Sequence, residues 1–427
     1  MTTCIVGGGP AGIMLGYLLA RDGVPVTILE KHADFLRDFR GDTVHPSTLE
    51  LLYELGLLED FLKLPHQKVY SASGSYGDYQ FQGPDFTHVP AHCKFVAFMP
   101  QWHFLNFLTQ RAQRYAGFDL RMRHEAIGVT RDGDRINGVI VRQPDGEKLE
   151  LNAQLVVACD GRHSIVRTSA HMEMFEFGVP IDVLWFRLNR EPDDAENVLG
   201  TVNYGKALVL INRGDYFQAG MIIRKGAFEE IKRRGLDAFR RSILELVPHF
   251  GERVDSLQDW DQIKLLTVQT NRLKQWHRPG LLCIGDAAHA MSPAAGVGIN
   301  LAIQDAVAAA NILAEPLREG CISEDLLAAV QARREFPARV VQSAQVAVHK
   351  AFARVFDNPG PLHAPWQLRV GSRIPGIHRA LGYYIGIGVR PEHVRNRRGK
   401  RPPRAAVVIA VAAGVVAAFV VLRGRSR

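Results

Sequence analysis

The sequence is poor in cysteine and lacks any close spacing of metal-binding residues. It contains 5 cysteines in 427 residues, with no C-x-x-C pair and no short Cys/His cluster. Disulfide-stapled secreted domains are dense in cysteine, and structural zinc sites need closely spaced ligands. The sequence therefore predicts no metal site, and it favours a reducing compartment.

Other signatures of function are absent as well. The chain has no G-x-S-x-G, no H-E-x-x-H, and no second G-x-G-x-x-G for a stably bound nicotinamide nucleotide.

The main body of the chain has no large excess of charge of either sign. The formal net charge is +8, but residues 390–427 hold ten Lys/Arg against one acidic residue, so the rest of the chain carries −1. A neutral body gives no electrostatic basis for binding nucleic acid, and we expect no such partner.

Only one uninterrupted apolar run has membrane length. Residues 405–422 contain no polar side chain and lie between Arg404 and Arg423. As a helix the run spans ~27 Å, close to the ~30 Å of a bilayer core. Flanking arginines make burial in a soluble core costly, so we expect a transmembrane helix rather than a frayed tail or a packed helix. The larger basic cluster precedes the run and the N-terminus resembles no signal peptide, which places the catalytic body in the cytoplasm.

The first thirty residues predict a strand, a glycine loop, a helix and a second strand. Gly7, Gly9 and Gly12 match G-x-G-x-x-G, and Glu30 ends the second strand. In this pattern the loop and the helix N-terminus bind a pyrophosphate, while the acidic residue accepts hydrogen bonds from a ribose. Glu30 would repel a 2′-phosphate, so FAD or NAD is favoured over NADP. The predicted site comprises Gly7, Gly9, Pro10, Ala11, Gly12, Glu30 and Lys31.

A second motif favours FAD over NAD. The apolar strand 281–284 leads into Gly285 and Asp286, and a turn at 293–300 then opens a helix. A carboxylate at a strand end suits the ribityl hydroxyls of a flavin, and a helix N-terminus stabilises negative charge on the reduced ring. The alternative is an ordinary strand–turn–helix with an N-cap aspartate. His289 is expected to be a packed, hydrogen-bonded residue. The predicted contacts are Asp286, Pro293, Gly298, Ile299 and Asn300.

Three further segments complete a family pattern. Residues 159–167 carry Asp160, residues 40–50 carry Arg40, and Gln101 opens a helix. With the two nucleotide motifs, over residues 1–395, they resemble the single-component (group A) FAD-dependent aromatic hydroxylases of the p-hydroxybenzoate hydroxylase fold. The nearest in kind are ubiquinone-pathway hydroxylases and prenylquinolone monooxygenases. The resemblance implies that Asp160 lies near FAD and NAD(P)H, that Arg40 positions the flavin for reduction, and that Gln101 touches FAD. The W-x-W-x-I-P signature of tryptophan halogenases is absent.

The expected fold is α/β: a Rossmann-like FAD-binding domain with an inserted β-rich substrate domain and a C-terminal membrane-anchor helix. The FAD-binding parts are 1–70, 101–168 and 276–358, and the substrate-domain parts are 71–100 and 169–275. A Pro/Gly-containing and basic linker, 359–404, then precedes the anchor. Strand residues expected to face the substrate are Trp185, Arg187, Phe217 and Gln218, although for Trp185 and Phe217 core packing is an equal alternative.

The resemblance implies an NAD(P)H-consuming monooxygenase of secondary metabolism, such as antibiotic biosynthesis. NADH or NADPH reduces FAD, the reduced flavin captures O2, and a C4a-hydroperoxide hydroxylates or epoxidises an electron-rich aromatic. The predicted anchor favours a lipophilic substrate, such as a prenylated phenol, quinone precursor or quinolone, unless it only localises an enzyme with a soluble substrate. Two alternatives stay open: a membrane-associated FAD-dependent reductase of isoprenoid double bonds, and a flavoprotein without oxygenase activity.

Overall fold

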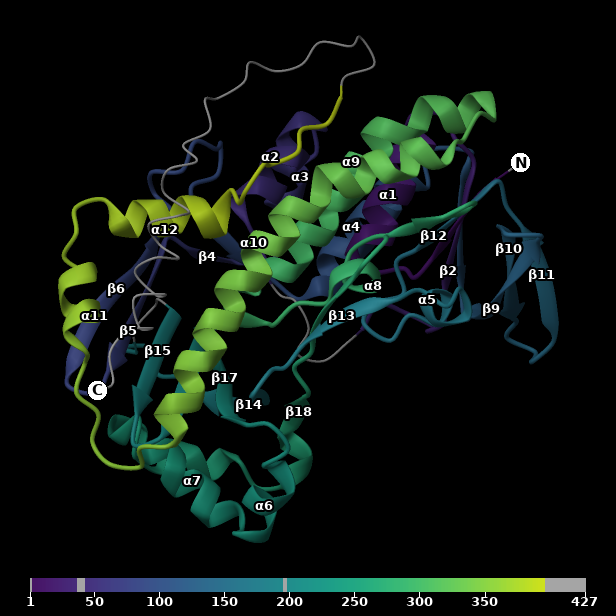
Figure 1. The fold of residues 1–427 in the computed structure, drawn as a ribbon. Helices are drawn as coiled ribbons and strands as arrows, with labels where there is room; N and C mark the ends of the chain where they lie inside the picture. Colours follow the sequence, from purple (N-terminus) through teal and green to yellow (C-terminus); the bar gives the residue numbers. More distant parts are fainter. Residues whose placement is uncertain (1, 37–42, 195–197, 396–427) are drawn as a thin grey trace, which may run out of the picture.

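The computed structural model describes residues 2–36, 43–194 and 198–395, and these form two lobes joined by a long helix (Figure 1). Arg40, the last residues of the predicted linker and the predicted anchor at 405–422 lie outside the described residues.

The larger lobe is built on a six-stranded sheet in the order β20-β21-β12-β1-β2-β8. All its strand pairs are parallel except β20 with β21. Ile5 packs on one face, against α1, α4 and α9, whereas Cys4 and Val6 pack on the other, near β10 (Arg135–Arg142). Such burial on both faces explains why these strands are continuously apolar. The elements are β1 (Thr3–Val6), β2 (Val26–Glu30), β8 (Phe118–Met122), β12 (Leu155–Ala158), β20 (His277–Arg278), β21 (Leu281–Cys283), α1 (Pro10–Arg21), α4 (Gln101–Ala112) and α9 (Val297–Glu319).

The second lobe is a seven-stranded sheet in the order β18-β14-β17-β16-β15-β5-β6. It joins two distant parts of the chain, because β5 pairs in parallel with β15. One face packs on α6, α7 and η1, and the other faces the larger lobe. The elements are β5 (Ser71–Tyr76), β6 (Tyr79–Asp85), β14 (Ile181–Asn189), β15 (Val198–Asn203), β16 (Lys206–Asn212), β17 (Tyr216–Arg224), β18 (Lys264–Leu266), α6 (Phe228–Arg233), α7 (Leu236–Leu244) and η1 (Pro248–Ser256).

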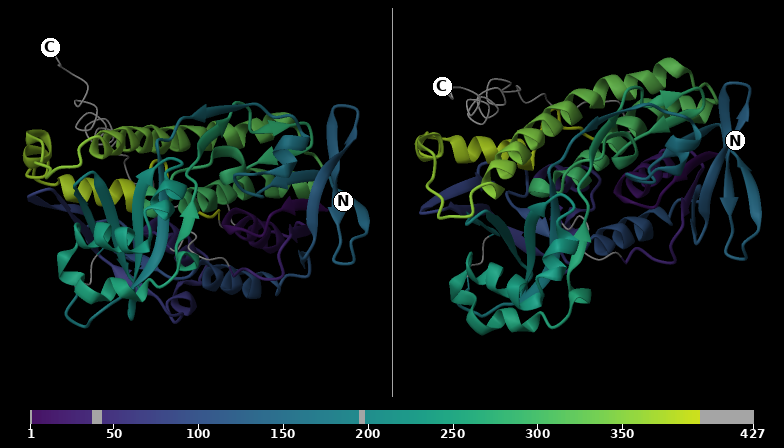
Figure 2. Two further views of the ribbon diagram at one scale, coloured as in Figure 1. Left: turned by 90° about the horizontal axis from the view of Figure 1, so that it is seen from below. Right: turned by 60° about the horizontal axis from the view of Figure 1, so that its bottom comes forward.

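Smaller elements connect the lobes. These are a three-stranded sheet in the order β3-β7-β4 and the pair of β13 with β19. A third small sheet, the antiparallel β9–β11, lies beside the N-terminus (Figure 2). The strands are β3 (Thr43–Val44), β4 (Gln67–Val69), β7 (Val96–Phe98), β9 (Glu125–Asp132), β10 (Arg135–Arg142), β11 (Lys148–Asn152), β13 (Met174–Phe177) and β19 (Thr270–Leu273). The remaining short helices are α2 (Pro46–Glu54), α3 (Leu58–Phe61), α5 (Ile165–Ser169), η2 (Trp260–Gln262), α8 (Asp286–His289) and η3 (Ala294–Gly296).

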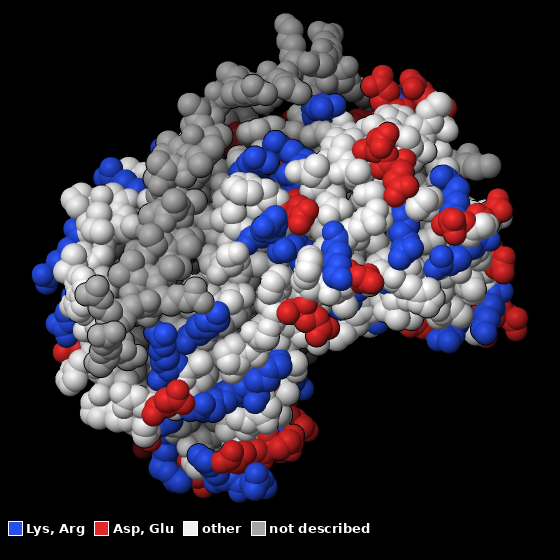
Figure 3. Space-filling model, in the orientation of Figure 1, with Lys and Arg blue, Asp and Glu red and all other residues white. Residues whose placement is uncertain are grey.

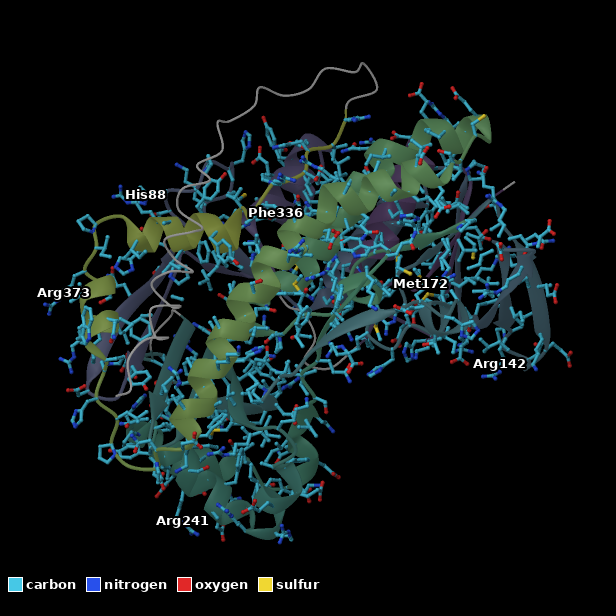
Figure 4. All side chains as sticks on the ribbon, in the orientation of Figure 1. His88, Arg142, Met172, Arg241, Phe336 and Arg373 are labelled. Atoms are coloured by element: carbon cyan, nitrogen blue, oxygen red, sulfur yellow. The ribbon has the colours of Figure 1, made fainter. Side chains whose placement is uncertain are left out.

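The longest helix, α10 (Glu324–Phe356), runs from the larger lobe to the seven-stranded sheet, as both views of Figure 2 show. Its N-terminal half packs on α9 and β20. Near its C-terminal end, Phe352 and Phe356 pack on an apolar cluster that includes Ile181 and Val183 of the sheet. Phe336, labelled in Figure 4, lies on the solvent side, where the guanidinium of Arg390 lies 4.7 Å from its ring.

The described part of the predicted linker is folded, which corrects that prediction. It contains α11 (Trp366–Gly371) and α12 (Ile377–Gly386), and α12 packs on β6. A Cβ atom at Gly382 would lie 1.9 Å from the carbonyl oxygen of Asp85, so this glycine permits the close approach. A composition rich in proline and glycine therefore marks tight helix packing here rather than a loose connection.

One helical stretch among the described residues, Ala294–Glu319, is long and apolar enough to cross a membrane. Most of its side chains are buried within the larger lobe, where it packs on α1, α2 and α10. Its apolar character is that of a core helix. On the face shown in Figure 3, basic and acidic side chains are interspersed over both lobes, as expected for a nearly neutral body.

Candidate functional site

A cavity of about 1060 Å³ lies between the carboxyl ends of the parallel strands and the inner face of the seven-stranded sheet. This volume slightly exceeds the ~300–1,000 Å³ of ordinary small-molecule sites, and strand ends are where open α/β sheets bind ligands. Most of the predicted cofactor residues line it: Gly7, Gly9, Pro10, Ala11, Glu30, Lys31, Gln101, Asp160, Asp286, Pro293, Gly298 and Ile299.

The three glycines of the first loop have different structural roles. Gly7 has a φ of +106°, and a Cβ atom there would lie 2.4 Å from the carbonyl oxygen of Cys159. A Cβ atom at Gly12 would lie 2.0 Å from the carbonyl oxygen of Gly7. Gly9, in contrast, has nothing within 4 Å of that position and faces the cavity. Gly7 and Gly12 therefore allow the tight fold, and Gly9 leaves room for a phosphate beside the start of α1.

Glu30 holds the loop in place as well as lining the cavity. Its Oε2 accepts a hydrogen bond of 3.0 Å from the backbone N–H of Gly8, and its Oε1 accepts one of 3.0 Å from that of His32. The carboxylate is thereby fixed at the end of β2, where an adenosine ribose would meet it.

Two aspartates end adjacent strands of the sheet. Asp160 follows β12, and its Oδ2 accepts hydrogen bonds from the backbone N–H groups of Ile165 (2.8 Å) and Val166 (3.3 Å) at the start of α5. Burial raises the pKa of Asp160. Asp286 follows β21, and Nη2 of Arg162 lies 3.6 Å from its Oδ2. The Asp286 side chain is 33% exposed, so its carboxylate is open to a ligand in the cavity.

The turn before α9 is joined to the segment before α2 by hydrogen bonds of Asn300. Its Oδ1 accepts from the backbone N–H of His45 (3.0 Å) and from Oγ1 of Thr48 (2.7 Å). Oγ1 of Thr43 donates to the carbonyl of Gly296 at 2.9 Å. Asn300 is buried and does not line the cavity, so its side chain fixes the shape of the turn and makes no direct contact with a ligand there.

A buried ionic network lies behind the second motif. Oδ2 of Asp305 accepts hydrogen bonds from the N–H of Gly285 (3.0 Å) and from Nε2 of His289, while Oδ1 accepts from Nε of Arg334 (2.9 Å). Burial alone raises the pKa of Asp305, but His289 and Arg334 outweigh burial and leave that pKa lowered. The prediction that His289 is a packed, hydrogen-bonded residue is confirmed, since it is 2% exposed.

The strand residues predicted to face the substrate are divided between two faces of the sheet. Trp185 and Gln218 line the cavity, and the Trp185 ring lies across Gly220 of the neighbouring strand. Phe217 points to the opposite face, where its ring lies 5.7 Å from that of Phe250. Because successive strand residues alternate between faces, Gln218 and Phe217 cannot both meet a ligand. The prediction for Phe217 is wrong.

The prediction that Arg187 faces the substrate is also wrong. It lies opposite Gln218 in the β14–β17 pairing, yet it is exposed beyond the cavity. Its guanidinium lies 4.8 Å from the centre of the Tyr216 ring. Arg213 takes a place in the wall instead: its Nε donates to Oε1 of Gln218 at 2.9 Å, and its guanidinium lies 5.4 Å from the Phe98 ring.

Two buried histidines of the cavity wall were missed by the sequence analysis. His45 precedes α2, and His349 lies on α10, with its Nε2 2.8 Å from Oγ of Ser292. Burial lowers the pKa of each to about 4. The one signal for His349 is a helical face of a long helix that also carries Gln342 and Gln345, and it does not tell which cavity the helix reaches.

The residues present fit FAD. Gly9 leaves an open approach at a helix N-terminus, Glu30 lies at the ribose end, and Asp286 and the 293–299 turn follow along the same cavity. The donor and acceptor types match a dinucleotide whose pyrophosphate meets backbone N–H groups and whose hydroxyls meet carboxylates.

Comparison with known proteins agrees with this geometry. Residues 1–344 match the family model described as FAD binding domain. The chain is 32% identical over 338 residues to 6-methylpretetramide 4-monooxygenase of Streptomyces rimosus, covering 78% of this chain and 79% of that protein. It is 27% identical to the rifampicin monooxygenase of Streptomyces venezuelae, covering 71% of this chain and 61% of that protein. The crystal structure of PqsL from Pseudomonas aeruginosa superposes with a TM-score of 0.71 at 24% identity, covering 84% of this chain and all of PqsL.

The chain therefore belongs to the group A aromatic hydroxylase family of FAD-dependent monooxygenases, with FAD as cofactor and NAD(P)H and O2 as co-substrates.

Proposed function

We propose that the enzyme inserts one oxygen atom of O2 into an electron-rich, lipophilic aromatic compound, such as a phenol, quinone precursor or quinolone, by hydroxylation or epoxidation. The observation that carries this proposal is the continuity of the cavity. One end meets the glycine loop and the other meets the inner face of the seven-stranded sheet, so cofactor and substrate would share one continuous cavity.

The sheet end of the cavity suits a flat apolar ring. Its wall is made mostly of apolar side chains from four strands and α10, which exclude water from the space they surround. Bound FAD supplies the oxidation–reduction chemistry, and the chain orients the ring and keeps the space dry. The apolar wall residues are Ile181, Val183, Trp185, Val209, Ile211, Ile222, Leu266 and Phe352.

The relatives support an aromatic substrate of natural-product size. By their names, two of them oxidise 6-methylpretetramide and rifampicin, and PqsL has been crystallised with 2-aminobenzoylacetate. We infer that this chain accepts a ring system of one to several fused rings, which the cavity volume accommodates beside a dinucleotide.

We further propose that residues 405–422 attach the enzyme to the membrane, with the catalytic body in the cytoplasm. The support is the sequence alone: an apolar run of membrane length between basic clusters. Attachment would bring the cavity to a substrate dissolved in lipid, and this is the reason to favour a lipophilic, for example prenylated, ring.

The test is oxidation of NADH and NADPH with simultaneous O2 uptake, screened over phenols, quinolones and their prenylated forms. We expect substrate-stimulated oxidation and a product that carries one atom from isotopically labelled O2. Reduction of a substrate double bond under nitrogen would indicate a reductase instead. Oxidation that yields only hydrogen peroxide with every aromatic tested would contradict the proposed substrate class.

A further inference from the structure

His45 lies on the cavity wall where the cofactor and substrate ends meet. It follows β3 and precedes α2, and it is 1% exposed. On one side the wall continues with Gly296 and Ile299 of the turn before α9. On the other side it continues with Phe86 and Phe98, which pack in one apolar cluster with Ile385. The polar ring of His45 thus lies between a hydrogen-bonded turn and an apolar cluster, where each of its nitrogens needs a partner.

Two hydrogen bonds fix the position of His45. Its backbone N–H donates to Oδ1 of Asn300 at 3.0 Å, and its Nδ1 lies 2.8 Å from the carbonyl oxygen of Ile385. A carbonyl oxygen only accepts, so Nδ1 carries the hydrogen. In the neutral ring Nε2 is then the acceptor, and its lone pair lies on the opposite side from Ile385.

The ring is neutral at physiological pH. Burial lowers the pKa of His45 to about 4, although the bond to Ile385 acts in the opposite direction. None of the described residues donates a hydrogen bond to Nε2. Nε2 is not among the fully buried atoms without a partner, and His45 lines the cavity, so this nitrogen is open to the cavity. An apolar ligand there would bury the acceptor without a partner, so a ligand that brings a donor would bind more tightly than an apolar group of the same shape.

We propose that Nε2 of His45 accepts a hydrogen bond from a phenolic hydroxyl of the substrate, and that His45 thereby selects hydroxylated aromatics. The assignment rests on the proposed function, since it names the substrate class of the same cavity. The bond directs the hydroxyl oxygen toward the boundary at Gly296 while the ring lies against Phe86 and Phe98. The bond also polarises the O–H group, which makes the ring more electron-rich.

Two substitutions separate this role from a structural one. In His45→Asn the amide nitrogen replaces Nδ1 and keeps the bond to Ile385, but no atom remains at the place of Nε2. In His45→Gln the longer amide restores a polar group at that place. The probes are 1-naphthol and naphthalene, which differ by one hydroxyl, and binding to the FAD-loaded enzyme is measured from the change in the flavin absorption spectrum.

We expect the parent enzyme to bind 1-naphthol about tenfold more tightly than naphthalene. His45→Asn should bind the two equally while keeping its FAD, and His45→Gln should recover part of the preference. An unchanged preference in His45→Asn would overturn the assignment, as would loss of FAD from that variant, because His45 would then only hold the turn before α9.

A second measurement needs no variant. Nitrogen NMR of the 15N-histidine-labelled holoenzyme should show His45 protonated on Nδ1 alone, and 1-naphthol should shift its Nε2 resonance. Protonation on Nε2 instead, or no shift with bound 1-naphthol, would refute the proposal. Both measurements report on binding, so they fail separately from the oxygen-insertion test of the proposed function.

Discussion

At the scale of single residues, the two aspartates that follow β12 and β21 have the same carboxylate group but different roles, because one is buried and the other is partly exposed. Asp160 is enclosed, its pKa is raised by burial, and one of its oxygens accepts from the first N–H groups of α5. Asp286 occupies the equivalent place one strand away, but its side chain is partly exposed to the cavity. Asp160 therefore orders the chain, whereas the carboxylate of Asp286 is open to the cavity, where we predict that it meets the ribityl hydroxyls of the flavin.

We expect Asp286→Ala to weaken FAD binding by roughly tenfold to a hundredfold, because hydrogen bonds to a charged group contribute ~1.5–3 kcal/mol. The measurement is FAD content after gel filtration and the dissociation constant of added FAD. Asp357→Ala is the matched control, because Asp357 also pairs with an arginine, Arg224, but lies on the surface. Equal FAD retention in the two variants would show that Asp286 does not contact the flavin.

The sequence predicts the nucleotide end of the site well because its signals are local. Gly12 is required by the carbonyl of Gly7 in the same loop, and Gly7 by its own positive φ as well as by Cys159 on the adjacent strand, so the spacing within the loop carries the information. The substrate end depends on which face of a strand is turned inward and on which distant helix covers it. Phe217 was misplaced for the first reason, and His349 was missed for the second. Arg40 lies outside the described residues, and its role in flavin reduction stays a prediction.

At the scale of elements, side chains of α10 hold the segment that forms the cofactor end of the cavity. Three polar residues on one face of this helix, Gln342, Gln345 and His349, bond to the chain that follows α8. Gln342 donates to the carbonyl of Ala290 at 3.1 Å, and Gln345 bonds to both backbone groups of Ser292. Helical periodicity predicts that such a helix exists, but not that its polar face holds the 290–294 segment in place.

We expect Gln345→Ala to loosen residues 290–296 and to weaken FAD binding severalfold. Its Oε1 accepts from the N–H of Ser292 and its Nε2 donates to the carbonyl of Ser292, both at 3.1 Å. Losing the partner of a buried backbone group costs ~1–3 kcal/mol. The measurement is amide hydrogen exchange of residues 290–296 together with FAD affinity.

Gln331→Ala is the control for this substitution. Gln331 lies on the same helix and also makes two backbone bonds, to the N–H of Trp276 and the carbonyl of Lys274, away from the cavity. The Gln331→Ala substitution should lower the free energy of unfolding without raising amide hydrogen exchange at residues 290–296. Equal exchange in the two variants would mean that α10 stabilises the lobe as a whole and not the turn.

At the scale of the whole molecule, the end of the described chain closes onto the larger lobe. Glu392 accepts from the buried Arg334 at 3.3 Å, the backbone N–H of Val394 donates to Glu54 at 2.7 Å, and Arg395 donates to Asn311. The folded body thus extends to Arg395, well beyond the helices that carry the nucleotide motifs.

Acid should destabilise the protein before its carboxylates are protonated. The pKa values of His45 and His349 are lowered to about 4, below the ~6.5 of an unfolded histidine. Between these values the unfolded state binds more protons, so the free energy of unfolding falls as the pH drops from ~6.5 toward ~4. The pKa of His393 is raised because it bonds to Glu54, so its effect on the free energy of unfolding has the opposite sign. This effect is small because the His393 side chain is half-exposed.

The measurement is the urea midpoint at pH 7 and pH 5. We expect a clear decrease at pH 5, and a smaller decrease in His45→Asn, which has one fewer buried histidine to protonate. Identical midpoints at the two pH values in the parent protein would mean that neither ring is held neutral by burial.

Membrane attachment is expected to be separable from flavin chemistry. Among the described residues, contacts hold the C-terminal segment to the larger lobe as far as Arg395, and the predicted anchor begins at residue 405. The full chain should sediment with membranes and resist extraction by high salt, since salt weakens only the attraction of the basic cluster to anionic lipid. A chain ending at Arg395 should be released and keep its FAD.

The double substitution Val411→Asp, Val415→Asp is a control of full length. This variant should also be released, because each central charge costs ~2.5–3.5 kcal/mol on insertion. Full-length protein found wholly in the soluble fraction would contradict the anchor, and loss of FAD from the shortened chain would show instead that the tail packs against the fold.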